Sequence, residues 1–534
     1  MSYFNTLRNG QSLACLLPPE ILNSIFSLTS NVFSDFSSRP LEAARREESF
    51  DWHPMCLSGV CRYWKAVALS FPSIWSTIDI CDEDECPSSS SIDIAKLCLR
   101  RSYNGCVDVH ISCPIPKAEL PWITETLASQ SIRFRGFHIY GFSFGPEILQ
   151  HFAEDPAPEL QSLTISPQGD FSNGSGIVLP MLFAGYTPRL RHLVLKHITS
   201  WPGNDFSNLR SLRLEDQVAS CPISKFLDFL HHSPHLEDLI LVCAGPSEAD
   251  PAVQLRQLSL PRLRQLVLKE CPAICQATRI LPYIQPSPTV TIMIDRTYYN
   301  NSLTTGSNIA RCNTLLATMS RFASMPNITR LLLDTFSSFD RGSHKLRLTG
   351  TGLSSFDICP SADIHEMASN QYMAAAIGLI SACNIQELWI GSDHVIQKDY
   401  IWQRLLFAMP SLKKIVLGPW DSHTPGCLLA LHTPDESVGR ALPCPSLEEL
   451  VILGRLGESK WSCEAVQKLL VNRKARGFPV RRVVLVRRTH DTSFDLHPTA
   501  DRFREIVEKM EIQTVPRYPT MEGSEAARAL GRYF

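Results

Sequence analysis

The sequence has no excess charge of either sign. Its 51 lysines and arginines nearly balance 53 aspartates and glutamates, which leaves a formal net charge of −2. Because nucleic-acid binding needs concentrated positive charge, this balance gives no general argument for such a partner. Long apolar runs are also missing, since the longest, MAAAIGLISAC at residues 373–383, is too short to cross a bilayer. We therefore expect neither nucleic acid nor a membrane among the partners.

The sequence also carries no sign of secretion. Its first residues, MSYFNTLRNGQSLACLLPPE, lack the charged start and apolar core of a signal peptide. The 18 cysteines lack the dense, regular spacing of a disulfide scaffold, and no close pair is completed to a zinc site. Most of them are expected to be buried thiols. We therefore expect a cytoplasmic or nuclear protein, or one found in both places, with no metal and no cofactor.

At 534 residues the chain is too long for one ordinary core, so several domains or an elongated array of repeats is expected. Apolar residues make up 44% and charged residues 19% of the sequence, which is typical of a folded chain. A search for internal repeats is therefore the way to distinguish several domains from an array of repeats.

A short apolar pattern recurs through most of the chain. Each copy has apolar residues at offsets 0, 3 and 5, as in PRLRHLVLK with Leu190, Leu193 and Leu195. The ten clear copies begin at Leu160, Leu190, Leu209, Leu236, Leu263, Ile328, Ile385, Leu412, Leu447 and Val480. Weaker copies fit at Cys106, Phe134 and Leu353, with a doubtful one near Thr289. Segments with a helical pattern precede many copies, so each unit predicts a helix, a turn and a short strand.

This pattern resembles the leucine-rich repeat over roughly residues 105–490. The resemblance implies an α/β fold, a solenoid with parallel strands inside and helices outside. The Asn or Cys that the family carries three places after the last Leu is mostly missing here. We therefore expect an uneven solenoid.

Two apolar helices are predicted before the repeats. The stretch LLPPEILNSIFSLTS at residues 16–30 begins with a proline pair, which suits a helix start. The stretch LSGVCRYWKAVALSFPSIW at residues 57–75 places Val60, Cys61 and Trp64 on one helical face. A helix with so apolar a face must bury it, either in the core of its own domain or against another protein.

Together these two stretches resemble an F-box. The matching residues are Leu17, Pro18, Glu20, Ile21, Leu22, Ile25, Phe26, Leu57, Val60, Cys61, Arg62, Trp64 and Ala68, followed by FPSIW at residues 71–75. An F-box followed by leucine-rich repeats is a known family architecture, abundant in fungi as irregular variants. We expect an F-box-like helical domain over 1–80 with an inserted loop at 31–54, a linker over 81–104, the solenoid over 105–490, and a cap or tail over 491–534.

The resemblance implies docking onto the Skp-family adaptor of a Skp–cullin–F-box ubiquitin ligase, and through that adaptor to a cullin. The contact residues carried over are Leu17, Pro18, Ile21, Leu22, Ile25, Val60, Cys61 and Trp64. For several of them a role in the helical core alone is the alternative. The chain would be a substrate receptor without catalytic residues, and the runner-up is a leucine-rich-repeat scaffold that does not join a cullin ligase.

The repeat also predicts a place for an unknown target protein. Offset 4 of each copy faces away from the inward residues and is mostly apolar, so it forms a row along the sheet. The candidate target-binding residues in this row are Ile240, Val267, Leu332, Trp389, Val416 and Val451. Two other readings stay open: β-branched residues suit any strand, or the chain's own tail covers the row, with residues 498–510 as an amphipathic helix.

Two further motifs are given less weight. GFSFG at residues 141–145 matches a nucleophile elbow with Ser143, but a turn between a repeat strand and a helix explains the same residues. The basic stretch RKARGFPVRRVVLVRR at 473–488 is interpreted as exposed charges flanking the last strand.

Overall fold

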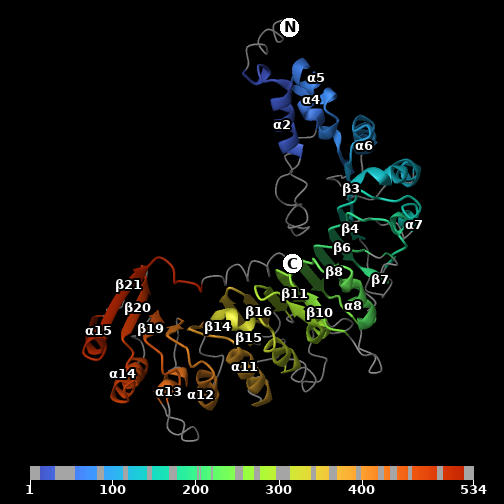
Figure 1. Ribbon diagram of the computed structural model, residues 1–534. Helices are drawn as coiled ribbons and strands as arrows, with labels where there is room; N and C mark the ends of the chain where they lie inside the picture. Colours follow the sequence, from blue (N-terminus) through green and yellow to red (C-terminus); the bar gives the residue numbers. More distant parts are fainter. Residues whose placement is uncertain are drawn as a thin grey trace. The chain divides into compact units, whose positions relative to one another are not determined.

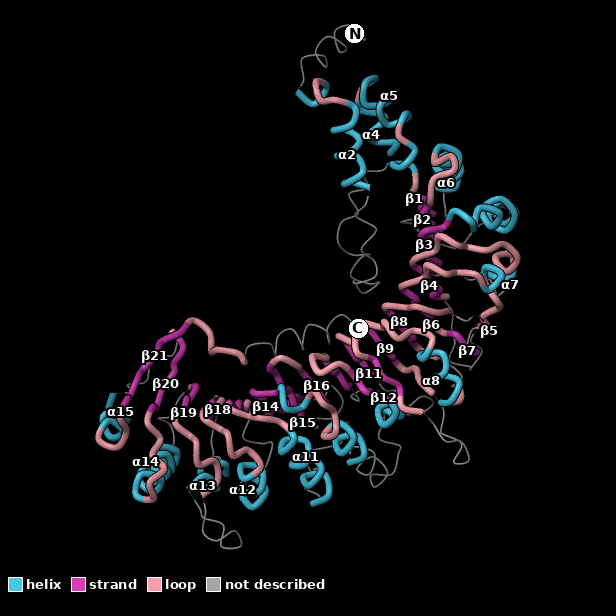
Figure 2. Tube along the Cα trace, viewed as in Figure 1, coloured by secondary structure: helices cyan, strands magenta, loops and turns pink. Residues whose placement is uncertain are grey.

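The computed structural model describes residues 13–30, 54–80, 89–111, 118–140, 147–167, 177–200, 204, 206–217, 221–246, 256–269, 277–295, 313–337, 344–359, 370–391, 399–418, 426–432, 442–454, 460–489 and 497–521. These residues belong to two compact units, the first containing those up to residue 246 and the second those from residue 256. Within each unit, helices lie along one side of a row of strands (Figures 1 and 2).

The first unit opens with short helices. They are η1 (Leu13–Cys15), α2 (Pro19–Ser30), α4 (Pro54–Val60), α5 (Arg62–Ser70) and η3 (Pro72–Trp75). The single helix expected from residue 57 onward is instead broken at Cys61, whose extended backbone (φ −159°, ψ 171°) separates α4 from α5. The side chain of Cys61 then caps α5, so the break is also a helix start.

A parallel sheet follows in the first unit. Its strands, in the order in which they pair, are β1 (Thr77–Ile80), β2 (Val107–Ile111), β3 (Phe134–Tyr140), β4 (Ser162–Ser166), β6 (His192–Lys196), β8 (Ser211–Glu215) and β9 (Asp238–Val242). Connecting helices are α6 (Ser89–Arg101), η4 (Trp122–Leu127), η5 (Ala128–Arg133), α7 (Glu147–Gln150), η6 (Phe183–Gly185) and α8 (Ile223–His231). Strands β5 (Ile177–Val178) and β7 (Ile198–Ser200) form a separate parallel pair.

The second unit is built in the same way. Its main sheet runs in the order β11 (Gln265–Lys269), β13 (Thr291–Asp295), β16 (Ser355–Cys359), β15 (His344–Gly352), β14 (Ile328–Ser337), β17 (Glu387–Ile390), β18 (Lys414–Leu417), β19 (Glu449–Leu453), β20 (Arg482–Arg488) and β21 (Lys509–Val515). Its helices are η7 (Ala277–Tyr283), η8 (Met325–Asn327), α11 (Asn370–Ala382), α12 (Asp399–Phe407), α13 (Gly426–His432), α14 (Lys460–Ala475) and α15 (His497–Arg504). Strands β10 (Leu258–Leu260) and β12 (Ile284–Pro286) pair in parallel.

One insertion interrupts the parallel order in the second unit. Strand β14 turns back into β15, which pairs antiparallel with both β14 and β16. Strand β16 then pairs in parallel with β13, and β14 pairs in parallel with β17. The chain therefore passes through these three strands in the reverse of their spatial order, which the repeat pattern alone did not predict.

The apolar positions of the repeat form the core, as expected. In the ten clear copies every residue at offsets 0, 3 and 5 is at most 3% exposed. Strand register brings equivalent positions together, since Leu163 pairs with Leu193, Leu193 with Leu212, and Leu212 with Leu239. Each such side chain contributes roughly 1.5–3 kcal/mol by leaving water, so the repeated leucines are the main source of stability.

The weaker copies are less accurate. Phe134 is buried at the first position of its copy, but Cys106 is exposed and Val107 is buried in its place. Thr289 is likewise exposed beside buried Val290, and Leu353 is 80% exposed. A register shift between Val107 and Asp108 accounts for the first difference, since it adds a residue to one side of the β2–β3 pair.

The fold is thus α/β, with mostly parallel strands and helices beside them. In each unit the sheet includes one strand from outside the expected repeat region of residues 105–490. These strands are β1, which pairs with β2 in the first unit, and β21, which pairs with β20 in the second. The stretch expected as a linker contains a helix, α6, over residues 89–101. Across the described ranges, no helix is both long enough and apolar enough to span a membrane.

Two buried histidines stack on the sheet of the first unit. His110 on β2 and His138 on β3 are register partners, and their ring centroids are 4.8 Å apart. The Nδ1 atom of His138 lies 2.9 Å from the hydroxyl of Thr164 on β4. Burial lowers the pKa of His110 to about 4, although Asp108 opposes the shift. Burial, and then repulsion from His110, lower the pKa of His138 well below its usual value.

We expect mild acid to destabilise the first unit through this pair. The unfolded chain protonates His110 near pH 6.5, whereas the folded protein does so only near pH 4. Because the unfolded state binds the proton more tightly, the unfolding free energy falls as the pH falls, by about 2 kcal/mol at pH 5 from His110 alone. Urea denaturation at pH 7 and pH 5 measures this loss. Replacing both histidines by glutamine should remove most of the difference, and an undiminished difference would contradict the assignment.

Candidate docking surface

The amino-terminal helices share a small core. Leu22 and Phe26 of α2 are buried one helical turn apart, and Leu57 of α4 and Val67 and Ala68 of α5 are buried as well. Helix α2 packs against α4, α5 and η3. One face of each helix is therefore used within the domain.

A second apolar stripe on α2 faces solvent. Ile21, Ile25 and Leu28, at spacings of four and three residues, are 48%, 40% and 73% exposed. Val60 at the end of α4 is 55% exposed. The same region exposes more apolar side chains, namely Leu13, Leu16, Met55 and Leu69. Because α2 carries a single charged residue and α4 none, this surface has the composition of a protein contact site.

Side-chain bonds tie the segment before α2 to the start of α5. The hydroxyl of Tyr63 donates to the carbonyl of Leu17 at 2.6 Å, and the sulfur of Cys61 accepts the Trp64 backbone N–H at 3.4 Å. The Trp64 ring lies tilted against Phe26 with centroids 5.1 Å apart. Its indole N–H is buried and has no hydrogen-bond partner within the described ranges. An unpaired buried N–H costs about 1–3 kcal/mol, so a partner that brings an acceptor here removes that cost.

The residues expected to contact an adaptor do not all lie on this surface. Pro18, Ile21, Ile25 and Val60 are exposed, and Leu17, Cys61 and Trp64 are half-buried. Leu22 is only 1% exposed, so its expected place on the contact surface is corrected to the core. The apolar residues of α2 divide into a buried stripe and an exposed stripe, which the sequence pattern did not separate. Leu13 and Leu16 were not among the expected contact residues, since their sole signal is their apolar character just before the proline pair.

The second candidate site, the apolar row at offset 4 of the repeats, is not exposed. Ile240, Val267, Leu332, Val416 and Val451 are each at most 8% exposed, which contradicts the expectation that they form an open contact row. Trp389 alone in the candidate set is half-buried. The position of an offset-4 side chain on the outer side of a strand is therefore not sufficient to expose it.

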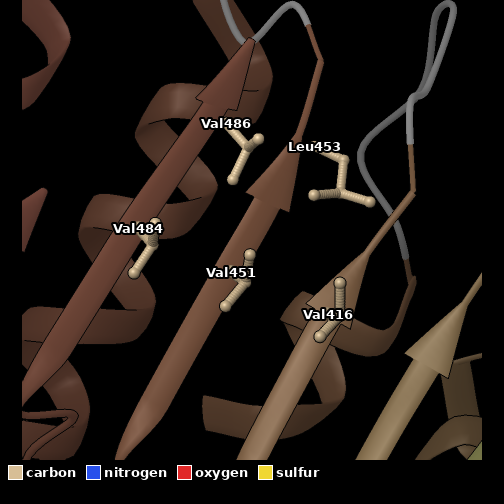
Figure 3. Close-up of a cluster of buried hydrophobic side chains, with 5 residues drawn as sticks. All are labelled: Val416, Val451, Leu453, Val484 and Val486. Atoms are coloured by element: carbon tan, nitrogen blue, oxygen red, sulfur yellow. The ribbon is translucent and has the colours of Figure 1, made fainter. Parts of the chain in front are cut away.

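Part of the offset-4 row is covered by other residues of strands β19 and β20 and by residues that follow these strands in the sequence. Figure 3 shows Val416, Val451 and Val484 together with Leu453 and Val486, and these five side chains form one buried group, the valine cluster. Packed against the cluster are Trp389, Val515 and Tyr518. The Arg488 guanidinium lies 5.2 Å from the centroid of the Tyr518 ring.

The chain itself thus covers this end of the row, as one of the open readings supposed. The covering residues are not those expected, because α15 ends at Arg504 and residues 509–515 form β21 instead of continuing a helix. Coverage comes from the end of that strand and from Tyr518 just after it.

Beside the valine cluster runs a row of charges of alternating sign at offset 2. Strand register aligns Arg330, Glu387, Lys414, Glu449 and Arg482. Glu387 pairs with Arg330 at 3.4 Å and with Lys414 at 3.1 Å, and Arg482 pairs with Glu449 at 3.3 Å. These ion pairs are half-exposed and add little stability, but they give the sheet face a fixed polar pattern.

Trp389 is held by this charged row. Its indole N–H donates to the Glu387 carboxylate at 2.8 Å, and the Lys414 ammonium lies 5.9 Å from its ring centroid. Trp389 and the charges around it are therefore what remains of the expected target surface.

No catalytic or metal centre emerges from the residues described. Ser143 and almost all of the 31–54 insertion lie outside them. In the parts of the chain that the structure describes, no three His, Cys, Asp or Glu side chains are grouped to hold a metal ion. No protein-family model matches the chain, and no curated protein matches its sequence.

Proposed function

We propose that this chain is a substrate-receptor subunit of a Skp–cullin–F-box ubiquitin ligase. In this proposal the amino-terminal helices are an F-box that docks onto a Skp-family adaptor, and the two strand-and-helix units are an irregular leucine-rich-repeat solenoid that holds a target protein. The chain carries no chemistry of its own. Holding the target beside the partner enzymes raises its effective concentration, which is the whole catalytic contribution.

The observation that carries the docking half is the exposed stripe of Ile21, Ile25 and Leu28 beside the buried pair Leu22 and Phe26. The domain core uses the buried pair, which leaves the exposed stripe free to contact a partner. Exposed apolar groups of this kind are stabilised when a partner covers them, at roughly 25 cal/mol for each Å² removed from water.

The target half is supported by the regular register of the strands and by Trp389. Solenoids present their strands as a continuous surface for partners. With most of the apolar row covered, we place target contact at Trp389 and the charged residues that hold it, Glu387 and Lys414. Tryptophan often dominates the energetics of an interface when it becomes fully buried there.

Reconstitution with purified partners tests the proposal. The full chain, mixed with a Skp-family adaptor and then a cullin, is expected to elute from size-exclusion chromatography as a stoichiometric complex containing all three proteins. A complex with the adaptor that excludes the cullin would contradict ligase membership.

The alternative is a leucine-rich-repeat scaffold that does not join a cullin ligase. It predicts that the folded chain, verified by circular dichroism, fails to bind the adaptor at all. That result would reject the receptor proposal and leave the sheet face around Trp389 as the place to look for partners.

A further inference from the structure

Two cysteine sulfurs touch at the base of the docking surface. The Sγ atoms of Cys15 and Cys61 are 3.8 Å apart, although the residues are separated by 46 positions in the sequence. Cys15 ends η1, and Cys61 caps α5. Both side chains are half-buried, so a small oxidant can reach them. The hydrogen bond from Tyr63 to Leu17 holds the Cys15 segment close to the start of α5.

The environments of the two sulfurs differ. The Cys61 sulfur accepts the backbone N–H of Trp64 in the first turn of α5, where the helix dipole also favours negative charge. Burial and the neighbouring Cys61 sulfur raise the pKa of Cys15, which therefore keeps its proton longer. Because the Cys61 sulfur accepts a backbone N–H and the Cys15 sulfur lies 3.8 Å from it, we assign Cys61 as the sulfur that is oxidised first and Cys15 as the sulfur that attacks it afterwards.

Two other cysteines in the described part of the chain are placed less favourably for this chemistry. Burial raises the pKa of Cys98 and of Cys444 to about 12, so their thiols stay protonated at neutral pH. Cys106 is exposed in the turn before β2 and serves as a reference for ordinary surface reactivity.

We infer that Cys15 and Cys61 are a redox-active pair that closes to a disulfide when the protein meets hydrogen peroxide. The Cys61 thiolate attacks one peroxide oxygen, the O–O bond breaks, and hydroxide leaves and takes a proton to become water. Cys15 then attacks the sulfur of the resulting sulfenic acid, and a second water leaves as the S–S bond forms. The two thiols lose two electrons and two protons in total, and a dithiol reductant reverses the change.

Closing the bond needs a modest movement. A disulfide has an S–S length of about 2.05 Å, so the sulfurs must approach each other by less than 2 Å from their present separation of 3.8 Å. The 3₁₀ segment that carries Cys15 is three residues long and contains no buried residue, so we expect it to be the part that moves. Because Cys61 is also a proposed adaptor contact, oxidation would change the docking surface; this consequence rests on the proposed function, whereas disulfide formation does not.

Peptide mapping of the peroxide-treated full chain tests the inference. Limited peroxide should remove two free thiols and yield a linked peptide pair containing Cys15 and Cys61, and dithiothreitol should restore both thiols. In the Cys15→Ser chain the linked pair should disappear, and Cys61 should instead be labelled by dimedone as a sulfenic acid. The Cys61→Ser chain keeps a capping oxygen for α5 and should lose both products. Cys106→Ser should leave the result unchanged.

Two outcomes would overturn the inference. One is labelling of Cys61 by dimedone in the unmodified chain without any linkage to Cys15. The other is the formation of disulfides between chains through exposed cysteines, with both Cys15 and Cys61 still reduced. Neither measurement involves an adaptor, so failure here is distinct from failure of the proposed function.

Discussion

A chain carrying Ile25→Asp and Val60→Asp is expected to bind a Skp-family adaptor at least a thousandfold more weakly than the unmodified chain. Both side chains are exposed, at 40% and 55%, so the free chain can solvate the new carboxylates and keep its fold. In the complex each carboxylate would be taken out of water without a partner, which costs several kcal/mol, and about 1.4 kcal/mol is worth a factor of ten. Isothermal titration calorimetry with purified adaptor measures the change.

A matched control is available elsewhere on the chain. Leu353→Asp together with Tyr103→Asp introduces the same two charges at side chains that are 80% and 67% exposed, far from the helices in sequence. Tyr103 has a positive φ of 48°, a conformation that aspartate tolerates. The control should bind the adaptor normally. Equal binding by both variants would show that α2 and α4 do not carry the docking surface.

The structure also indicates which substitutions to avoid in this test. Trp64 packs on Phe26, so Trp64→Ala would remove part of the domain core together with any contact to a partner. A substitution at Leu22, which is buried, would likewise disturb the domain core. Loss of binding by either variant would not separate folding from docking, whereas Ile25 and Val60 do separate them.

The core of the repeats could be predicted from the sequence because its apolar residues are periodic. Leucines at offsets 0, 3 and 5 identify the positions that face the core, because only apolar side chains are accepted there. The same argument fails for copies with a single weak position. At Thr289 the next residue, Val290, takes the buried position. Leu353 is exposed where the antiparallel strand β15 turns into β16.

The offset-4 row could not be predicted in the same way. A period of two places Val416 and Val451 on the opposite face from the core leucines, but it does not say what lies over that face. Val515 and Tyr518 pack there, and both come from a part of the chain that has no repeat pattern. Contacts between residues so far apart in sequence depend on the tertiary structure, which a local sequence pattern does not predict.

Arg473 shows the same limit for charged residues. It opens the basic stretch at residues 473–488, which is expected to carry exposed flanking charges, yet its exposed fraction is 0%. From α14 its guanidinium donates to the carbonyls of Leu431 at 3.2 Å, Pro443 at 3.0 Å and Cys444 at 2.8 Å. Burial lowers the pKa of Arg473 and raises that of the adjacent Cys444 thiol to about 12. Within the described residues, the three carbonyl dipoles solvate the buried guanidinium.

Replacing Arg473 by methionine is expected to lower the unfolding free energy of the second unit by about 3–4 kcal/mol. The buried carbonyls of Leu431 and Pro443 would lose the guanidinium donor, at about 1–3 kcal/mol each, whereas the Cys444 carbonyl keeps the backbone N–H of Leu447 at 3.1 Å. The loss is partly offset because a charge no longer has to be buried. The guanidinium joins α14 to α13 and to the turn before β19, so its removal loosens three elements at once. Urea denaturation followed by circular dichroism at neutral pH measures the change.

Arg476→Met is the matched control, because Arg476 is exposed on the same stretch of chain. Its substitution should change the unfolding free energy by no more than about 0.5 kcal/mol. If the two variants were equally stable, the carbonyls around Arg473 would have to find other donors, and the guanidinium would not be the clamp that its three bonds describe. A large difference would establish that one arginine in a run of basic residues is part of the core, which means that charge alone is a poor guide to exposure where several carbonyl groups converge.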